Sequence, residues 1–185
     1  MRIAVYSGSF DPLHIGHLAI MEYLTRRRQF DCIYLVVSPQ NPFKDPSKAL
    51  SAQRRVDAAR EAVARHPGLK VKVEDIELTM EPPQYTIRTL DALRQREPDN
   101  EFTLVIGADN LDNFRGWRDY RRILLEYGVV VYPREGFRPV SLRTSLLQED
   151  GRYRIRVVRA PEVNISSTRI REGIAAGEDM SEYLM

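Results

Sequence analysis

Short apolar runs rich in β-branched residues alternate along the chain with longer stretches of helical period. Residues 3–6 are typical of a buried strand, and the glycine- and proline-marked segment 8–12 that follows predicts a loop. Residues 15–28 place their apolar side chains on one helical face. Further strands are predicted at residues 33–37, 69–73, 102–106, 129–132 and 155–158.

The segments between these strands carry helical periodicity. Ser51 is a candidate N-cap for a helix that ends at His66-Pro67-Gly68, and a second helix follows the break at Glu81-Pro82-Pro83. The spacing of Trp117, Tyr120, Leu124 and Tyr127 predicts another helical face, and residues 166–175 predict a final helix. Residues 134–151 are the least regular stretch and are predicted to form a mobile loop.

Alternation of strands and helices over the whole length favours an α/β fold of the doubly wound, Rossmann-like kind. Its sheet is expected to be mostly parallel, with helices on both faces, in a single domain over residues 1–185. No repeat or linker composition marks a second domain. In such sheets ligands bind beyond the carboxyl ends of the strands, so the residues just after each strand are the candidates for chemistry.

Composition narrows the class of protein. The 185 residues are 43% hydrophobic and 29% charged, which excludes a wholly disordered chain. A net charge of +2 indicates neither a nucleic acid nor an anionic membrane as partner, and the arginine clusters are interpreted as solvated faces. One cysteine, Cys32, excludes an internal disulfide framework. Without a signal peptide or a membrane-length apolar run, a soluble cytoplasmic protein is expected.

The loop after the first strand carries the densest chemistry, in the segment Gly8-Ser9-Phe10-Asp11-Pro12-Leu13-His14-Ile15-Gly16-His17. A helix beginning near Ile15 offers free N–H groups and a positive dipole end to phosphate. His14 and His17 stand at that start and can donate hydrogen bonds to phosphate oxygens that gain charge. Gly16 lacks a side chain, so a flat base could approach the backbone there. The alternative is that His14 caps the turn and His17 is a core histidine.

This segment resembles the His-x-Gly-His signature of a nucleotidyltransferase superfamily. Near the other end, Ile165-Ser166-Ser167-Thr168-Arg169-Ile170-Arg171 is similar to the second signature of its adenylyltransferase branch. There Ser166 and Ser167 can cap a helix whose N–H groups, with the Thr168 hydroxyl and Arg171, hold phosphates, although an ordinary helix cap is the simpler alternative.

Three intermediate matches narrow the resemblance to bacterial nicotinate-nucleotide adenylyltransferases. They are Gln84-Tyr85-Thr86-Ile87-Arg88-Thr89-Leu90, Ile106-Gly107-Ala108-Asp109-Asn110-Leu111 with the following Trp117, and Tyr132-Pro133-Arg134-Glu135-Gly136-Phe137. Together the matches run in family order over residues 3–172. Two departures stand out: the basic position in the loop at Lys44 aligns only approximately, and relatives continue beyond the point where this chain ends, so the tail is either short or omitted.

The resemblance implies a division of roles. His14, His17, Lys44 and Arg171 would act on the phosphates. ATP would contact Gly8, Ser9, Phe10, Gly16, Gly107, Asp109, Ser166, Ser167 and Thr168, and the mononucleotide would contact Tyr85, Thr86, Leu111, Trp117 and Arg134. Asp109 would accept ribose hydroxyls, Trp117 would stack on the pyridine ring, and the Thr86 amide would receive its carboxylate. For Asp109 and Thr86 a helix cap, for Trp117 a core position, and for Lys44 and Arg134 a solvated surface position remain alternatives.

The reaction implied is adenylyl transfer from ATP to nicotinate mononucleotide, with Mg²⁺ carried by the ATP phosphates rather than held in a protein cage. Neither a Gly-x-Ser-x-Gly elbow nor a Cys–His signature provides a nucleophile, so direct attack is expected. Nicotinamide mononucleotide, phosphopantetheine or a cytidylyl-transfer alcohol as acceptor, and a nucleotide-binding module without catalysis, remain alternatives. The sequence leaves the acid-versus-amide preference and a homo-oligomer open.

Overall fold

The structure is a computed structural model that describes residues 1–26, 29–39 and 47–185. One six-stranded sheet has the order β3-β2-β1-β4-β5-β6, and every pair of neighbouring strands is parallel. The strands are β1 (Arg2–Gly8), β2 (Cys32–Val37), β3 (Val71–Glu74), β4 (Glu101–Gly107), β5 (Val129–Tyr132) and β6 (Ile155–Val157). The predicted Rossmann-like α/β class is confirmed.

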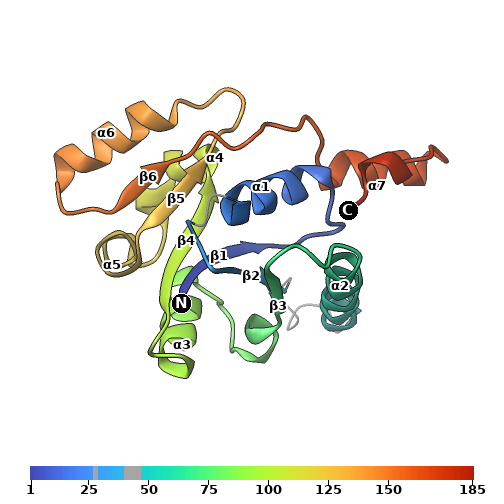
Figure 1. Cartoon of the computed structure of the whole chain (residues 1–185), viewed down its shortest axis with the longest axis horizontal. Helices are drawn as coiled ribbons and strands as arrows, with labels where there is room; N and C mark the ends of the chain where they lie inside the picture. The colour runs from blue at the N-terminus through green and yellow to red at the C-terminus, as the bar shows by residue number, and fades with distance from the viewer. Residues whose placement is uncertain (27–28, 40–46) are drawn as a thin grey trace.

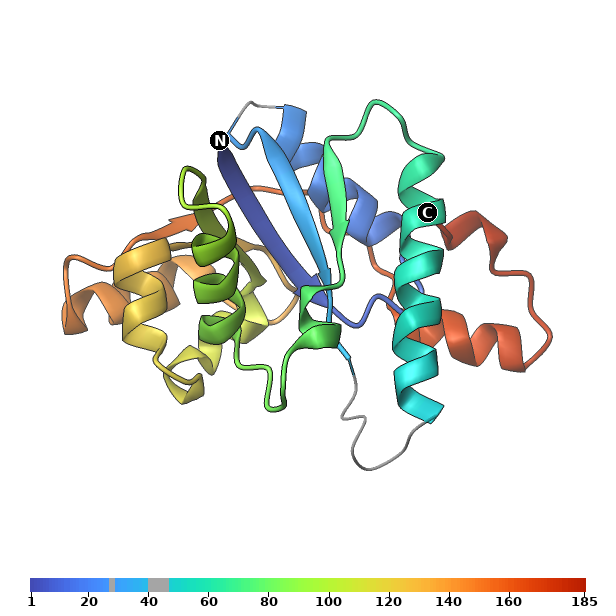
Figure 2. The same ribbon diagram turned by 90° about the horizontal axis from the view of Figure 1, so that it is seen from below.

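Helices cover both faces of this sheet, with α1 above it and α3 below it in Figure 1. The helices are α1 (Ile15–Arg26), α2 (Ser47–Ala64), α3 (Thr86–Arg96), α4 (Ala108–Asp112), α5 (Tyr120–Arg122), α6 (Pro139–Glu149) and α7 (Ser167–Ala175). Figure 2 shows α3 and α5 side by side against one face of the sheet. Arg122, the last residue of α5, donates two hydrogen bonds to the carboxylate of Asp91 in α3.

The buried side chains form two apolar clusters, one on each face of the sheet. Along β1, Ile3 and Val5 belong to the cluster under α3, whereas Ala4 and Tyr6 belong to the cluster under α1 and α2. Successive side chains of a strand point to opposite faces, so a strand buried on both sides appears in the sequence as an unbroken apolar run. This is why β1, β2 and β5 are recognisable from composition alone.

The chain leaves β1 toward β2 and β3 on one side, then crosses to β4, β5 and β6 on the other. The point where the direction reverses therefore lies between β1 and β4. Loops that leave the carboxyl ends of these two strands diverge there and open a crevice, which is the usual ligand position in open α/β sheets. The segments after Gly8 and Gly107 border this crevice.

The segment 134–151 is not a loop, which corrects the expectation from its irregular sequence. Residues Pro139–Glu149 form α6, with Pro139 in its first turn. Proline is favoured at that position because the first N–H groups of a helix have no partner within the helix. The proline therefore starts a helix here. Leu146 buries this helix against the core beside β6.

Two other expectations about helices need correction. The helix predicted to start after Ser51 begins four residues earlier, at Ser47. Trp117 does not share a continuous helix with Tyr127, because a short α5 begins at Tyr120 and a wider helical turn follows over Ile123–Tyr127. Both differences concern helix boundaries, which depend on capping contacts more than on periodicity.

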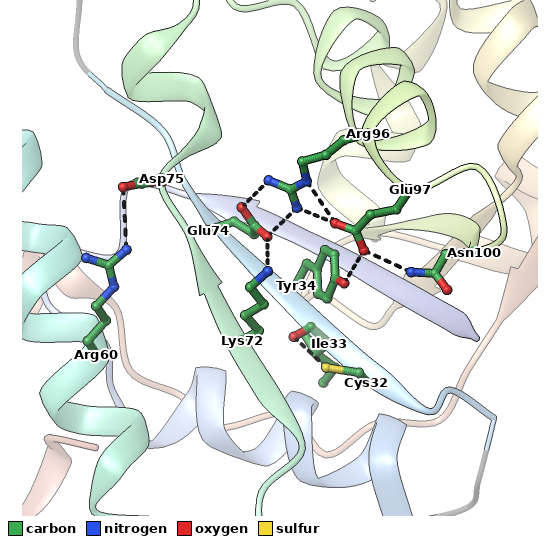
Figure 3. Close-up of polar contacts among 10 residues, drawn as sticks. All are labelled: Cys32, Ile33, Tyr34, Arg60, Lys72, Glu74, Asp75, Arg96, Glu97 and Asn100. Atoms are coloured by element: carbon green, nitrogen blue, oxygen red, sulfur yellow. Dashed lines mark hydrogen bonds and ion pairs between the residues drawn. The ribbon is translucent and has the colours of Figure 1, made fainter.

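A polar cluster fastens the C-terminal end of α3 to β2 and β3 (Figure 3). Glu74 at the end of β3 is buried and accepts two hydrogen bonds from Arg96, at 2.6 and 3.2 Å. It also forms an ion pair with Lys72 at 3.1 Å. The Tyr34 hydroxyl donates to Glu97 at 2.6 Å. We call Tyr34, Lys72, Glu74, Arg96 and Glu97 the β2–β3 cluster. It anchors the helix whose first turn carries Tyr85 and Thr86.

Candidate active site

The loop after β1 is folded tightly against the sheet by Phe10. Its backbone φ is 47°, and its buried ring lies over Gly8, where an added Cβ would come within 3.1 Å of the ring. The same ring packs edge-on against Tyr6, with centroids 5.3 Å apart, and against His17, at 5.1 Å. Phe10 thus directs the chain toward the start of α1 and helps to support the imidazole of His17.

His14 and His17 form a stacked pair at the beginning of α1. Their ring centroids are 3.7 Å apart and the planes are inclined by 24°. The backbone N–H of Gly16 donates to Nδ1 of His14 at 3.0 Å, and the backbone N–H of His14 donates to Nδ1 of His17 at 3.1 Å. A nitrogen that accepts cannot carry the proton, so the neutral form of each ring has its proton on Nε2. These backbone contacts select the tautomer.

Both imidazoles are held neutral near pH 7. Burial lowers the pKa of His14 to about 4, and the positive charge of Arg134 adds to the shift. Burial also lowers the pKa of His17 to about 3, with further contributions from His14 and Arg134. An uncharged imidazole with its proton on Nε2 offers one hydrogen-bond donor, and the two rings together offer two.

Gly16 supports the His14 imidazole. A Cβ on Gly16 would come within 2.9 Å of the His14 ring. The imidazole therefore lies against one side of the Gly16 backbone, and Gly16 also lines a cavity. The absence of a side chain at this position allows the Gly16 N–H to reach His14 Nδ1, which is the contact that fixes the ring.

A cavity of about 880 Å³ lies at the crevice between the β1 and β4 sides of the sheet. Six of the predicted site residues line it, namely His14, Gly16, His17, Asp109, Arg134 and Ser166. Its wall also includes Tyr132, Glu162, Asn164 and Arg169, which sequence reasoning did not single out. Residues from β5, from the segment before α7 and from α7 itself therefore meet the histidine pair across one space.

Asp109 lines this cavity with a carboxylate whose side chain is 45% exposed. It lies in the first turn of α4, directly after Gly107, and its Oδ1 is buried without any hydrogen-bond donor. Arg134 approaches this oxygen to 3.8 Å through Nε, which is an ion pair but not a hydrogen bond. A buried carboxylate oxygen without a donor is unfavourable, and the exposed part of the same carboxylate can accept from a bound hydroxyl group. Gly107 permits the arrangement, since a Cβ there would collide with Asp109 Oδ1.

The start of α7 is fastened to the loop after β1. Ser166 caps the helix by accepting from the Arg169 N–H at 3.1 Å. The Ser167 hydroxyl donates to the Pro12 carbonyl at 2.9 Å, and Arg171 donates to the Asp11 carbonyl at 2.6 Å and to the Thr168 hydroxyl at 3.3 Å. Ser167, Thr168 and Arg171 do not line the cavity, so their contacts join two loops instead.

The residues expected to hold the acceptor form a second group on the opposite side of the sheet. Tyr85 precedes α3 and is 40% exposed, with the Arg118 guanidinium 5.3 Å from its ring centroid, and Thr86 is the first residue of α3. Trp117 is partly buried, and its Nε1 donates to Asn113 at 3.2 Å. Leu111 is buried in the core. None of the four lines the 880 Å³ cavity.

The remaining predicted residues differ in status. Gly8, Ser9 and Phe10 belong to the loop under the histidine pair, whereas Lys44 lies outside the described residues. Over the part of the chain that the structure describes, no three His, Cys, Asp or Glu side chains are grouped to hold a metal ion. In the same residues, no helix has the length and apolar character needed to cross a bilayer.

Arg55 and Glu77 are buried polar residues that the sequence motifs do not indicate. Arg55 is 5% exposed and Glu77 is 4% exposed. Arg55 does carry a signal, because it occupies an inward position of α2 together with Ala52, Val56 and Ala59. A charged residue within an otherwise apolar face indicates a buried polar contact. Glu77 lies in the short helical turn Ile76–Thr79 and has no comparable signal.

Comparison with known proteins decides the family. Residues 5–173 match the cytidylyltransferase-like family model. A probable nicotinate-nucleotide adenylyltransferase of Bacteroides fragilis is 38% identical over 183 residues, which cover 99% of this chain and 87% of the relative. The protein of the same name from Cytophaga hutchinsonii is 39% identical, over 100% of this chain and 91% of the relative. This chain belongs to the nicotinate-nucleotide adenylyltransferase family.

Solved structures of nicotinate-nucleotide adenylyltransferases have the same fold as this chain. The Plasmodium falciparum nicotinic acid mononucleotide adenylyltransferase complexed with NaAD aligns with a TM-score of 0.77 at 18% identity, covering 99% of this chain and 90% of that one. At that identity the likeness concerns the fold alone. A putative nicotinate-nucleotide adenylyltransferase from Vibrio parahaemolyticus aligns with a TM-score of 0.63 at 25% identity, covering 100% and 93%. The sequence resemblance to nicotinate-nucleotide adenylyltransferases is confirmed.

Proposed function

We propose that this protein transfers the adenylyl group of ATP to nicotinate mononucleotide, which yields nicotinate adenine dinucleotide and pyrophosphate, a step toward NAD. A phosphate oxygen of the mononucleotide forms a bond to the α-phosphorus. The bond from that phosphorus to the bridging oxygen breaks, and pyrophosphate leaves with the electron pair. No protein nucleophile is needed. Family membership supports the reaction, and a reaction that consumes ATP supports a cytoplasmic location.

The observation that carries the proposal is the pairing of two kinds of group in one cavity. The stacked imidazoles of His14 and His17 supply uncharged donors, and Asp109 supplies an acceptor without a donor. ATP matches both, because its phosphates need donors and its ribose hydroxyls need an acceptor. His14 and His17 contact the α-phosphate and the bridging oxygen. Donors fixed in advance stabilise the charge that develops there.

The other predicted residues complete this assignment. Gly8, Ser9, Phe10, Gly16, Gly107 and Ser166 shape the ATP side, while Lys44, Ser167, Thr168 and Arg171 hold the departing pyrophosphate. For Arg171 and Ser167 this requires a partial exchange of their present bonds to Asp11 and Pro12. Mg²⁺ enters with ATP as part of the substrate, bound mainly by phosphate oxygens and water.

The acceptor side uses the group around the start of α3. Trp117 stacks on the pyridine ring, the Thr86 amide receives the nicotinate carboxylate at a positive helix end, and Tyr85 and Leu111 border this pocket. Arg134, on the ATP side of Gly107, meets the phosphate of the mononucleotide. The two substrates then approach each other over the ends of β1 and β4, from opposite faces of the sheet.

The experiment that tests the proposal compares acceptors. Pyrophosphate release is measured with Mg-ATP and, in turn, nicotinate mononucleotide, nicotinamide mononucleotide and phosphopantetheine. We expect rapid release with the acid and at least tenfold slower release with the amide. Equal rates would retain the reaction and reject the acid-specific pocket. Release only with phosphopantetheine, or with none, would reject the proposed function.

Asp109→Asn tests the ATP side separately. An amide keeps the shape of the carboxylate but loses its charge and one acceptor, and a hydrogen bond to a charged group contributes about 1.5–3 kcal/mol. We expect KM for ATP to rise by about 10- to 100-fold, while KM for the acceptor changes little. Asp112→Asn, on the exposed side of the same helix α4, serves as control. An unchanged KM for ATP would remove Asp109 from the ATP site.

A further inference from the structure

A chain of polar contacts runs along the carboxyl edge of the sheet, away from the cavity. It begins at Arg55 of α2, whose Nη1 donates to the Ser9 carbonyl at 2.7 Å and to the Ser38 carbonyl at 2.9 Å. Ser9 follows β1 and Ser38 follows β2, and the Ser38 N–H donates to the Gly8 carbonyl at 2.9 Å. One buried guanidinium therefore ties together the loops that leave two neighbouring strands.

The chain continues from Ser38 to α3 through Glu77. The Thr89 hydroxyl donates to the Glu77 carboxylate at 2.8 Å. Burial raises the pKa of Glu77, and Thr89 and the Ser38 side chain are close enough to oppose that shift. Thr89 is almost fully buried, and its N–H bonds to the Tyr85 carbonyl at 3.2 Å. We call Ser9, Ser38, Arg55, Glu77 and Thr89 the edge network. It links the loop under His14 to the helical turn that carries Tyr85 and Thr86.

The two charges of this network are not paired with each other. Among the described residues Arg55 and Glu77 form no ion pair, and Nε and Nη2 of Arg55 are buried without a hydrogen-bond partner. Burial lowers the pKa of Arg55, and the nearby charge of Asp11 opposes this only in part. A buried charge without a direct ion pair is unfavourable, and apolar side chains would fill the same space at less cost in stability. The contacts that these groups do make are all to loop carbonyls, hydroxyls and helix α3. Their arrangement is suited to fixing distances between segments.

We propose that the edge network is a positioning device that sets the ATP-side loop of β1 relative to the acceptor-side turn of α3. This inference rests on the proposed function. In-line attack requires the acceptor phosphate and the α-phosphorus to meet at a fixed separation and angle, and a displacement of about 1 Å can reduce the rate by about 10²-fold. Each substrate binds mainly to one side, so the network acts on their alignment more than on the affinity for either.

The test uses Thr89 first, because its hydroxyl and its methyl group can be removed separately. Thr89→Val keeps the shape and removes the bond to Glu77, whereas Thr89→Ser keeps the bond and removes a methyl group. We expect Thr89→Val to lower kcat about tenfold, with each KM changed less than about threefold, and Thr89→Ser to restore most of kcat. Thr144→Val, in which an exposed helical threonine loses its bond to the Val140 carbonyl, is the matched control.

A second arm tests whether the two ends act through the same chain of contacts. Arg55→Lys is combined with Thr89→Val in a double variant. Arg54→Lys, which changes the exposed neighbouring arginine, is the control for Arg55→Lys. We expect the double variant to lose no more than about threefold beyond the more severe single variant, because residues in one network are not additive. All rates are taken per folded molecule, well below the unfolding temperature. If Arg55→Lys does not fold, Ser38→Ala replaces it in the cycle; this removes the hydroxyl beside Glu77 and leaves the carbonyl that accepts from Arg55.

Several results would overturn the inference. One is an unchanged kcat in Thr89→Val, and another is a loss of kcat in Thr89→Ser as large as that in Thr89→Val. A third is a rise of one KM in Thr89→Val without a fall in kcat. The last is a double variant whose loss of kcat equals the product of the two single losses. Failure of the proposed function is distinguishable, because the wild-type protein would then release no pyrophosphate with nicotinate mononucleotide. That result would overturn the inference as well.

Discussion

Two regions of this molecule use the same residue types in opposite ways. In the β2–β3 cluster, the buried Glu74 is paired directly with Arg96 by two hydrogen bonds, and Lys72 adds a second positive charge (Figure 3). In the edge network, the equally buried Glu77 and Arg55 are separated by Ser38. One region neutralises its charges, whereas the other distributes them over loops that end at the site.

This difference in charge pairing indicates a different role for each region. A buried acid that is paired with arginine fastens a helix to a sheet, and removing the arginine leaves a charge without compensation. An arginine bonded to two carbonyls gains little from charge pairing, but it fixes the two segments that carry those carbonyls. We therefore expect changes in the β2–β3 cluster to alter stability, and changes at the carboxyl edge to alter catalysis.

The largest effect is expected at the edge itself, from His17→Ala. Loss of one preorganised donor to a developing negative charge typically lowers the rate by about 10²–10³-fold. We expect kcat to fall by that factor, with a much smaller change in the free energy of unfolding. The remaining histidine of the chain, His66, lies after α2, and His66→Ala should leave kcat unchanged. A near-normal kcat in His17→Ala would remove this ring from the mechanism.

Arg96→Met breaks the β2–β3 cluster and should give the reverse pattern. Glu74 would remain buried with only the half-exposed Lys72 as partner, and we expect the free energy of unfolding to fall by about 2 kcal/mol. The rate per folded molecule should not change. Arg94→Met, on the same helix, removes only half-exposed ion pairs and should lower stability by about 0.5 kcal/mol. Denaturant unfolding measures both, and equal losses would contradict the comparison.

The last effect concerns stability in acid, and it distinguishes neutral from charged groups. The pKa of His14 is lowered to about 4 and that of His17 to about 3, so in the folded protein both stay neutral well below pH 6. The unfolded chain takes up these protons near pH 6.5, so stability should fall as the pH decreases from about 7 toward 4. Between pH 7 and pH 5 we expect a loss of about 2 kcal/mol per imidazole.

Unfolding of wild type and His17→Ala at pH 7 and pH 5 measures this effect. The variant lacks one buried imidazole, so its stability should depend less on pH over that interval. Nuclear magnetic resonance of the imidazole protons gives a second readout, since the His14 and His17 signals should not titrate above pH 5. Identical pH dependence of the two proteins would contradict the burial of a neutral ring.

The fold was predictable from sequence where local signals and tertiary packing agree. Strand β1 is buried on both faces, so its apolar run predicts both its type and its place at the centre of the sheet. The error at residues 134–151 arose because Pro139 is a helix starter or a helix breaker depending on its position. Its role at the start of α6 follows from packing against α4 and β6, which periodicity does not record.

The candidate site was predictable only as a set of residues, not as an arrangement. Motifs identified His14, His17 and Asp109, but the stacking of the two rings depends on backbone donors that residue identity does not encode. The bond from Ser167 to Pro12 joins residues 155 positions apart, and it exists only because α7 returns to the loop after β1. Arg55 was missed for the same reason, since its partners are carbonyl groups.

The most direct test of the account is a structure of the protein with nicotinate adenine dinucleotide bound. The product contains both halves of the reaction, so it should span the ends of β1 and β4. We expect the adenosine ribose to donate to the carboxylate of Asp109, the diphosphate to lie against His14 and His17, and the pyridine ring to stack on Trp117. A dinucleotide confined to one face of the sheet, or bound away from the histidine pair, would contradict the account.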